Sequence, residues 1–429
     1  MKGTATLLIL FLLWAIPSSA ADTPGTIRVE LTVFPPEAEV SVIASNISDT
    51  SGTVSAGQRV FSALAPGTRL RISAPGYEDA IVHLPSTDAP PVLSIEERLF
   101  PAEGPVRLAA ELPTGGGPKS VAFVPGGRIV VPLLWDNGAD VFHVTADQYG
   151  QIGTERIERI APPGESAVDA GFVEPLSIAS RGELWISQMN GDRLHRFDLA
   201  GLRYRDSISA AGQWPKVMAM ISRDTGRELL VTSNWLSETV VFHDRATGEL
   251  VYEVALQGSP RGIAVVDARD EVWVAEFSTG DIVVIDAGNG TVLERLPLGP
   301  GAARHIVAHP WDGRLYYSDM YHGTVSIIDG QTRTVRRTRR FGSNINTIAI
   351  DPRGRYLYIS ERGRNNPENY QRPGPAFGRI FVVDADTLEL VQTVWGRHQP
   401  TGLAVSSDGS LLAATDFLDD NLSIYTVAE

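Results

Sequence analysis

Short apolar runs separated by polar turns recur along most of the chain. Between Pro260 and Leu298 the apolar runs are Gly262–Val266, Val272–Ala275, Ile282–Ile285 and Val292–Leu296, with turns rich in Asp and Gly between them. These runs are rich in β-branched residues, and they are too short and too often interrupted by glycine to be helices. The stretch therefore predicts four short antiparallel strands.

This four-strand unit repeats along the chain. An apolar residue in the first run of each unit recurs at Val121, Ile178, Met218, Ile263, Ile306, Ile348 and Leu403. A period of about 40–45 residues with four strands in each repeat is typical of a β-propeller. The pattern predicts an all-β fold with a seven-bladed β-propeller over residues 106–429. The last repeat has three strands, so we expect Val106–Leu112 to be its fourth strand and to close the ring.

The first 21 residues have the pattern of a secretory signal peptide. Lys2 precedes the apolar run Leu7–Ile16, and the small residues Ser18-Ser19-Ala20 follow it. The apolar run is too short to cross a bilayer as a helix. The pattern predicts a periplasmic or extracellular (secreted) protein without a membrane span after signal cleavage. The chain contains no cysteine, so its stability must come from packing.

Residues 26–97 do not follow the repeat and predict a separate small β-domain. Strands are expected at Thr26–Val33, Glu39–Ile43 and Arg69–Ser73. The segments Pro35–Val40, Leu64–Gly67 and Ala74–Glu78 resemble a PEGA-type domain, a small β-sandwich common in bacterial envelope proteins. The resemblance implies an adhesive or spacer role. Residues 98–105, which include Pro101, Gly104 and Pro105, are expected to form a linker.

The propeller repeats also resemble a known type. Residues 281–293 and Gly323–Asp329 look like the YVTN-type repeat of seven-bladed propellers, and degraded forms of the tetrapeptide occur at Leu230–Ser233, Tyr316–Asp319 and Tyr358–Glu361. Propellers of this type serve as surface scaffolds, as binding proteins and occasionally as enzymes, so the resemblance indicates a fold rather than an activity.

The net charge of the chain limits the classes of partner that it is expected to bind. A formal net charge of −14 argues against nucleic acid and against an anionic membrane surface. The basic run Arg333–Arg340 is the exception. We expect it on the outermost strand of the fifth repeat, where charged side chains discourage edge-to-edge pairing of sheets.

Two columns of charged residues are predicted to meet at one face of the propeller. One precedes the first strand of each repeat and the other ends the second strand. The insertions Pro162–Glu174 and Arg362–Gly378 belong to the same face, and the second carries aromatic residues. The predicted ligand site contains Lys119, Lys216, Arg261, Arg304, Glu276, Asp319, Glu361, Asp416, Tyr370 and Phe377. The alternative is that the two columns neutralise each other as structural ion pairs, each worth about 0–1 kcal/mol where exposed.

The sequence favours a binding or scaffold protein that recognises a small polar ligand, a protein, or peptidoglycan or another glycan of the cell envelope at this mouth. The alternative is a metal-dependent lactonase- or lyase-like enzyme that holds a divalent ion such as Ca²⁺ or Mg²⁺ in the same funnel. His305, His322 and His398 lie near this face, but they are not at a local metal-ligand spacing. We therefore assign no catalytic residue, no metal ligand and no required cofactor.

Overall fold

The computed structural model describes residues 26–43, 53–55, 57–86, 90–146, 152–164, 170–223 and 226–428. The predicted signal peptide lies outside these residues. The chain divides into two compact units, Met1–Leu99 and Phe100–Glu429. Within the described ranges, no helix combines the length and the apolar character that crossing a bilayer requires.

The described part of the first unit is a β-sandwich. One sheet has the order β3 (Thr53–Ser55), β4 (Gln58–Leu64), β1 (Ile27–Phe34) and β7 (Val92–Arg98), and the other has the order β2 (Glu39–Ile43), β5 (Arg69–Ser73) and β6 (Ala80–His83). Val29, Leu31 and Val33 alternate along β1 and point into a core that also contains Leu70. This alternation has the two-residue period of a strand with one buried face.

The sandwich extends further than the sequence predicted. Arg98 ends β7, and Leu99 packs in the sandwich core with 1% of its surface exposed. The Pro and Gly content of residues 98–105 predicts a linker that includes both residues. The apolar contacts of Leu99, which composition does not reveal, attach them to the sandwich.

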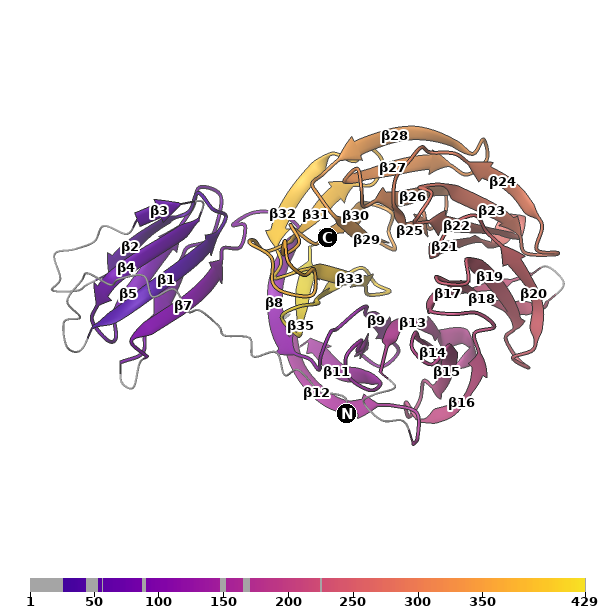
Figure 1. Cartoon of the computed structure of the whole chain (residues 1–429), viewed down its shortest axis with the longest axis horizontal. Coiled ribbons are helices and arrows are strands. Elements are labelled where there is room, and N and C mark those ends of the chain that lie inside the picture. Colours follow the sequence, from indigo (N-terminus) through magenta and orange to yellow (C-terminus); the bar gives the residue numbers. More distant parts are fainter. Residues whose placement is uncertain are drawn as a thin grey trace, which may run out of the picture. The chain divides into compact units, whose positions relative to one another are not determined.

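The second unit is a β-propeller with a seven-bladed ring of four-stranded antiparallel sheets among the described residues (Figure 1). The first blade contains β9 (Ala122–Val124), β10 (Arg128–Pro132), β11 (Ala139–Ala146) and β12 (Ile152–Ile160). The second contains β13 (Phe172–Ile178), β14 (Glu183–Gln188), β15 (Arg193–Asp198) and β16 (Tyr204–Ser209), with the 3₁₀ turn η2 (Ala179–Arg181) after β13. The third contains β17 (Pro215–Ser222), β18 (Glu228–Asn234), β19 (Thr239–Asp244) and β20 (Leu250–Ala255).

The remaining blades have the same order. The fourth contains β21 (Pro260–Val266), η3 (Asp267–Arg269), β22 (Glu271–Glu276), β23 (Ile282–Asp286) and β24 (Val292–Leu296). The fifth contains β25 (Ala303–Ala308), β26 (Arg314–Asp319), β27 (Thr324–Asp329) and β28 (Thr334–Arg340). The sixth contains β29 (Ile345–Ile350), β30 (Tyr356–Glu361), β31 (Arg379–Asp384) and β32 (Leu390–Trp395), and the seventh contains β33 (Pro400–Val405), β34 (Leu411–Asp416), β35 (Asn421–Val427) and β8 (Val106–Pro113).

The last blade is completed by a strand from the other end of the propeller sequence. β8 pairs antiparallel with β35, with Leu112 opposite Leu422 and Val106 opposite Val427. The side chain of Gln392 on β32 accepts from the Val106 N–H at 2.8 Å and donates to the Val106 carbonyl at 2.8 Å. This pairing leaves β35 without an open edge, which closes the ring of blades.

The core lies between the blades, and the outermost strands face solvent. Every residue of β14 and β22 is buried, and the indoles of Trp185 and Trp273 donate to the carboxylates of Glu183 and Glu271 at 3.0 and 2.9 Å. In contrast, every residue of β28 is exposed. The Arg-rich run therefore lies on an outermost strand, as the sequence predicted.

Candidate functional site

Irregular pairing at the start of the innermost strands positions the predicted cations. The ladder between the first and second strands is interrupted between Pro215 and Met218, between Pro260 and Ile263, and between Ala303 and His305. These interruptions contain Lys216, Arg261 and Arg304, respectively. An extra residue of this kind bends a strand and redirects its side chain.

The structure corrects the alignment of the second repeat. Met218, Ile263, Ile306, Ile348 and Leu403 each pair with the residue two places before the end of the second strand. In the second blade, Pro175 has this role because it pairs with Ile186, two places before Gln188. Ile178, which the sequence pattern places there, lies three residues further along the chain and pairs with Glu183. The interruption in β13 consequently contains Val173 and Glu174, and Val173 rather than Leu176 occupies the position of the cations in the other blades.

Arg261 and Arg304 lie close enough to Lys119 and Lys216 for their charges to act on both lysines. Burial lowers the pKa of the Lys119 ammonium well below its usual value, and the charges of Arg362, Arg304, Lys216 and Arg261 lower it further. Burial, followed by the fields of Arg261 and Arg304, lowers the pKa of Lys216 to about 7. The pKa of Arg304 is lowered as well, first by burial and then by Arg261.

Two residues of this cluster were not among the predicted site residues. Arg362 directly follows the acidic position at the end of β30, and Glu174 lies at the end of the insertion before the second repeat. Glu174 lies 2.5 Å from the Arg261 guanidinium. Burial alone raises the pKa of its carboxyl, but Arg261, the Ser120 hydroxyl and Arg304 hold it below its usual value. In the correct register Val173 occupies the column position and Glu174 follows it, so the signal for Glu174 in the sequence is its place at the end of the insertion Pro162–Glu174, which is predicted at this face. We call Lys119, Lys216, Arg261, Arg304, Arg362 and Glu174 the mouth cluster.

Serine hydroxyls of the preceding blade hydrogen-bond to the backbone of two cations in the mouth cluster. The Ser187 hydroxyl donates to the Lys216 carbonyl at 2.7 Å, and the Ser233 hydroxyl donates to the Arg261 carbonyl at 3.0 Å. Because both acceptors belong to the next blade, these bonds hold the backbone that carries Lys216 and Arg261.

The acidic column makes a different set of contacts, within its own blades. Glu276 accepts from the Gln257 N–H at 3.0 Å and pairs with Arg295. Asp319 accepts from the Ala302 N–H at 3.2 Å. Each acid thus satisfies a backbone donor in the loop that leads into the first strand of the same blade, a donor that would otherwise be left unpaired.

Glu361 and Asp416 follow the same rule. Glu361 accepts from the Ser343 N–H at 3.0 Å and from Arg379 at 2.9 Å, and Asp416 accepts from the Arg397 N–H at 2.9 Å. The acids named here thus contact loop N–H groups and, for Glu276 and Glu361, the arginines Arg295 and Arg379 rather than the four predicted cations. A role in ligand binding stays a prediction for all ten residues, but the contacts described here favour the cations over the acids.

Large side chains directly follow the second strand in blades two to seven; they are Met189, Trp235, Phe277, Met320, Arg362 and Phe417. Each of these six residues donates its N–H to the loop before the first strand of its blade; examples are Trp235 to Trp214 at 3.0 Å and Phe277 to Ser259 at 2.8 Å. The Lys119 ammonium lies 4.3 Å from the ring centre of Phe417. Aromatic rings at these positions, Phe417 and Trp235, therefore lie beside Lys119 and Lys216.

The sixth-blade insertion is anchored beside the mouth cluster. The Gln399 amide donates to the carbonyl of Tyr370 at 2.6 Å and accepts from Arg362. The Tyr370 side chain is exposed, whereas Phe377 is buried with its ring centre 4.7 Å from that of His398. Phe377 and Glu361 also line a cleft of about 610 Å³ with Arg340, Arg364, Arg379 and Trp395.

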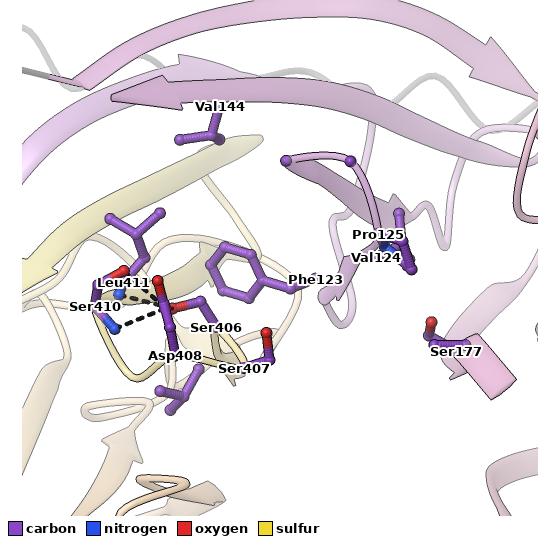
Figure 2. Close-up of a pocket in the computed structure, with 14 residues that line it drawn as sticks. Phe123, Val124, Pro125, Val144, Ser177, Ser406, Ser407, Asp408, Ser410 and Leu411 are labelled. Atoms are coloured by element: carbon purple, nitrogen blue, oxygen red, sulfur yellow. Dashed lines mark hydrogen bonds between the residues drawn. The ribbon is translucent and has the colours of Figure 1, made fainter. Parts of the chain in front are cut away.

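A second cleft lies at the opposite ends of the strands. It has a volume of about 580 Å³ and is lined by the turns after β9 and β33, with Phe123 on one side and Asp408 on the other (Figure 2). Asp408 accepts from the Ser406 hydroxyl at 2.6 Å and from the Ser410 N–H at 3.0 Å. This carboxylate is therefore used to hold its own turn.

The three histidines near the mouth do not form a metal centre with one another. His322 lies 2.8 Å from Asp319, and His398 lies 3.2 Å from Asp419. Burial lowers the pKa of His305 to about 4. Among the described residues, no group of three or more His, Asp or Glu side chains is placed to hold a metal ion.

Comparison with known proteins gives one extensive match. The chain is 33% identical over 370 residues to Antigen Lp49 of Leptospira interrogans serogroup Icterohaemorrhagiae serovar copenhageni, a match that spans 83% of this chain and 77% of that protein. It is 20% identical over 236 residues to the uncharacterized protein YncE of Salmonella typhi and to that of Salmonella typhimurium, covering 52% of this chain and 62% of each relative. No protein-family model matches the chain.

Proposed function

Since this chain belongs to the protein family of Antigen Lp49, we propose that it is a secreted or surface-exposed binding protein whose propeller mouth recognises a polar ligand, a glycan of the cell envelope or a protein partner. The word antigen in the relative's name is in keeping with exposure outside the cytoplasm. The N-terminal sandwich, proposed as a PEGA-type module, acts as a spacer or adhesive domain.

The observation that carries this proposal is the charge of the mouth cluster. Lys119, Lys216, Arg261 and Arg304 lie together although the charges of Arg261 and Arg304 disfavour the charged forms of both lysines. Folding does not require charge at these positions, since Asn346 and Thr401 occupy the corresponding places in the sixth and seventh blades. A cluster of like charges that costs stability is typical of a site kept for binding.

The first test is location. In fractionated cells, the chain should appear in the periplasmic, surface or culture fraction, and protease added to intact cells should degrade the surface form. Recovery of the intact chain only from the cytoplasm would contradict the proposal.

The second test is binding. A thermal-shift screen of envelope glycans, peptides and polar metabolites, with and without EDTA, should give hits that weaken in Arg304→Gln. The matched control is Arg205→Met, which removes an exposed cation from the outermost strand β16. Hits that bind Arg304→Gln as well as they bind the unmodified chain would place the site elsewhere, with the cleft that Phe377 lines as the next candidate.

A further inference from the structure

The mouth cluster contains far more positive than negative charge. Its five cations face a single carboxylate, Glu174, which is already paired with Arg261. We propose that the mouth cluster binds a compact anion that carries at least two negative charges on oxygen atoms, such as a polycarboxylate or a phosphate. This inference rests on the proposed function, because it specifies the ligand chemistry of the same mouth.

Two buried donors point to such a ligand. Arg261 and Arg304 are 4% and 6% exposed, and Nη1 of each has no hydrogen-bond acceptor among the described residues. A buried charged donor without a partner is costly, and guanidinium groups match the geometry of carboxylate and phosphate oxygens. An oxyanion that reaches both Nη1 atoms would supply the missing acceptors.

Among the residues that the structure describes, neither lysine of the cluster forms an ion pair with a carboxylate. Lys119 lies 4.3 Å from the ring centre of Phe417, and Lys216 lies 5.1 Å from that of Trp214. Lys119, Lys216 and Lys2 of the predicted signal peptide are the only lysines in the sequence. The remaining cationic residues of the chain are arginines. Both lysines that follow the predicted signal peptide therefore lie in the mouth cluster.

Proton uptake follows from this arrangement. The pKa of Lys216 is lowered to about 7 by burial and by Arg261 and Arg304, so a large part of this lysine is neutral above neutral pH. A bound anion would reverse that effect by favouring the charged ammonium. Anion binding above neutral pH must therefore be coupled to uptake of protons by the lysines.

Isothermal titration calorimetry on the full chain tests the proposal with citrate and inorganic phosphate as multivalent probes and acetate as the monovalent control. At about pH 8, in two buffers of different ionisation enthalpy, the heat should differ by the protons taken up from the buffer. We expect citrate or phosphate to bind more tightly than acetate, with net proton uptake. Glucose 6-phosphate and glucuronate, run in parallel, show whether the acid belongs to a larger sugar ligand.

The variants assign any binding to the cluster. Arg304→Gln should weaken binding by about 10- to 100-fold, the loss expected for one charged hydrogen-bonding partner. Lys216→Met should reduce the proton uptake, and Arg205→Met should change neither quantity.

Three results would overturn the inference. They are no binding by any acidic probe, no proton uptake in the unmodified chain, and unchanged affinity in Arg304→Gln. The second needs no variant, so it remains decisive if Arg304→Gln fails to fold. A glycan or protein that binds at the mouth but is not displaced by citrate would overturn this inference and leave the proposed function standing.

Discussion

Replacing Lys216 with methionine should stabilise the ligand-free protein. Methionine keeps an unbranched apolar chain beside Met189 and Trp214, which the lysine side chain contacts, but it removes a charge that the folded state disfavours. The change therefore isolates the electrostatic cost of the mouth cluster from the packing of this side chain.

The magnitude follows from the displaced pKa. A pKa lowered from 10.5 to about 7 corresponds to roughly 5 kcal/mol of unfavourable interaction with the charged form. Lys216 is partly exposed, so solvent and salt screen much of this unfavourable electrostatic interaction. We expect an increase of about 2 kcal/mol in the free energy of unfolding near neutral pH.

The stability gained by Lys216→Met should depend on pH. Between pH 7 and 10.5 the unfolded chain binds a proton at Lys216 that the folded chain has released, so the stability of the unmodified protein rises with pH in that window. The advantage of Lys216→Met should be largest near and below neutral pH and should shrink as the pH approaches 10.5.

Urea denaturation of the propeller transition, followed at several pH values and at low and high salt, measures this difference. The control Arg205→Met should shift stability by less than about 0.5 kcal/mol. A Lys216→Met protein that is less stable than the unmodified chain, or a stability gain that does not depend on pH, would refute the argument that the cluster is under electrostatic strain.

Three further predictions concern the fold. Gln392→Ala should destabilise the propeller by about 2–3 kcal/mol, because it leaves the buried N–H and carbonyl of Val106 unpaired; equal melting temperatures for the variant and the unmodified chain would contradict this closure role. For the same reason, a chain without residues 1–112, which lacks most of β8, should melt well below a chain without residues 1–99. Burial lowers the pKa of His195 to about 4, so stability should fall by up to about 3 kcal/mol as the pH drops from 6.5 toward 4; a slope as steep in His195→Gln would exclude this histidine as the cause. Asp140→Asn should cost about 3–5 kcal/mol, because the fully buried carboxylate pairs with Arg156 and Arg159 at 2.5 and 2.8 Å; urea midpoints within error of each other would contradict that estimate.

The strand pattern of the propeller could be predicted closely from the sequence. The apolar runs expected at Val272–Ala275 and Ile282–Ile285 lie within β22 (Glu271–Glu276) and β23 (Ile282–Asp286). Such strands are buried on both faces, so their apolar runs are continuous and their ends are marked by Asp and Gly.

The second repeat was misaligned because its pattern alone permits more than one register. β13 carries apolar residues at Phe172, Val173, Leu176 and Ile178, so several alignments place an apolar residue at the reference position. Only pairing with β14, in which Pro175 faces Ile186, selects one of them. The correct register places Val173 in the cation column and Glu174 one residue later, so the column alone does not identify Glu174.

The sequence by itself determined the repeat, the all-β class, the charged columns and the position of the Arg-rich strand, because each depends on residue type at a fixed spacing. Only the tertiary structure decided that the cations of different blades gather while the acids turn to the loops of their own blades. It also brought Glu174 of the second blade to Arg261 of the fourth. The physical reason is that the direction of a side chain depends on local strand irregularities and on hydrogen bonds between distant segments, and neither is encoded in the spacing of residue types.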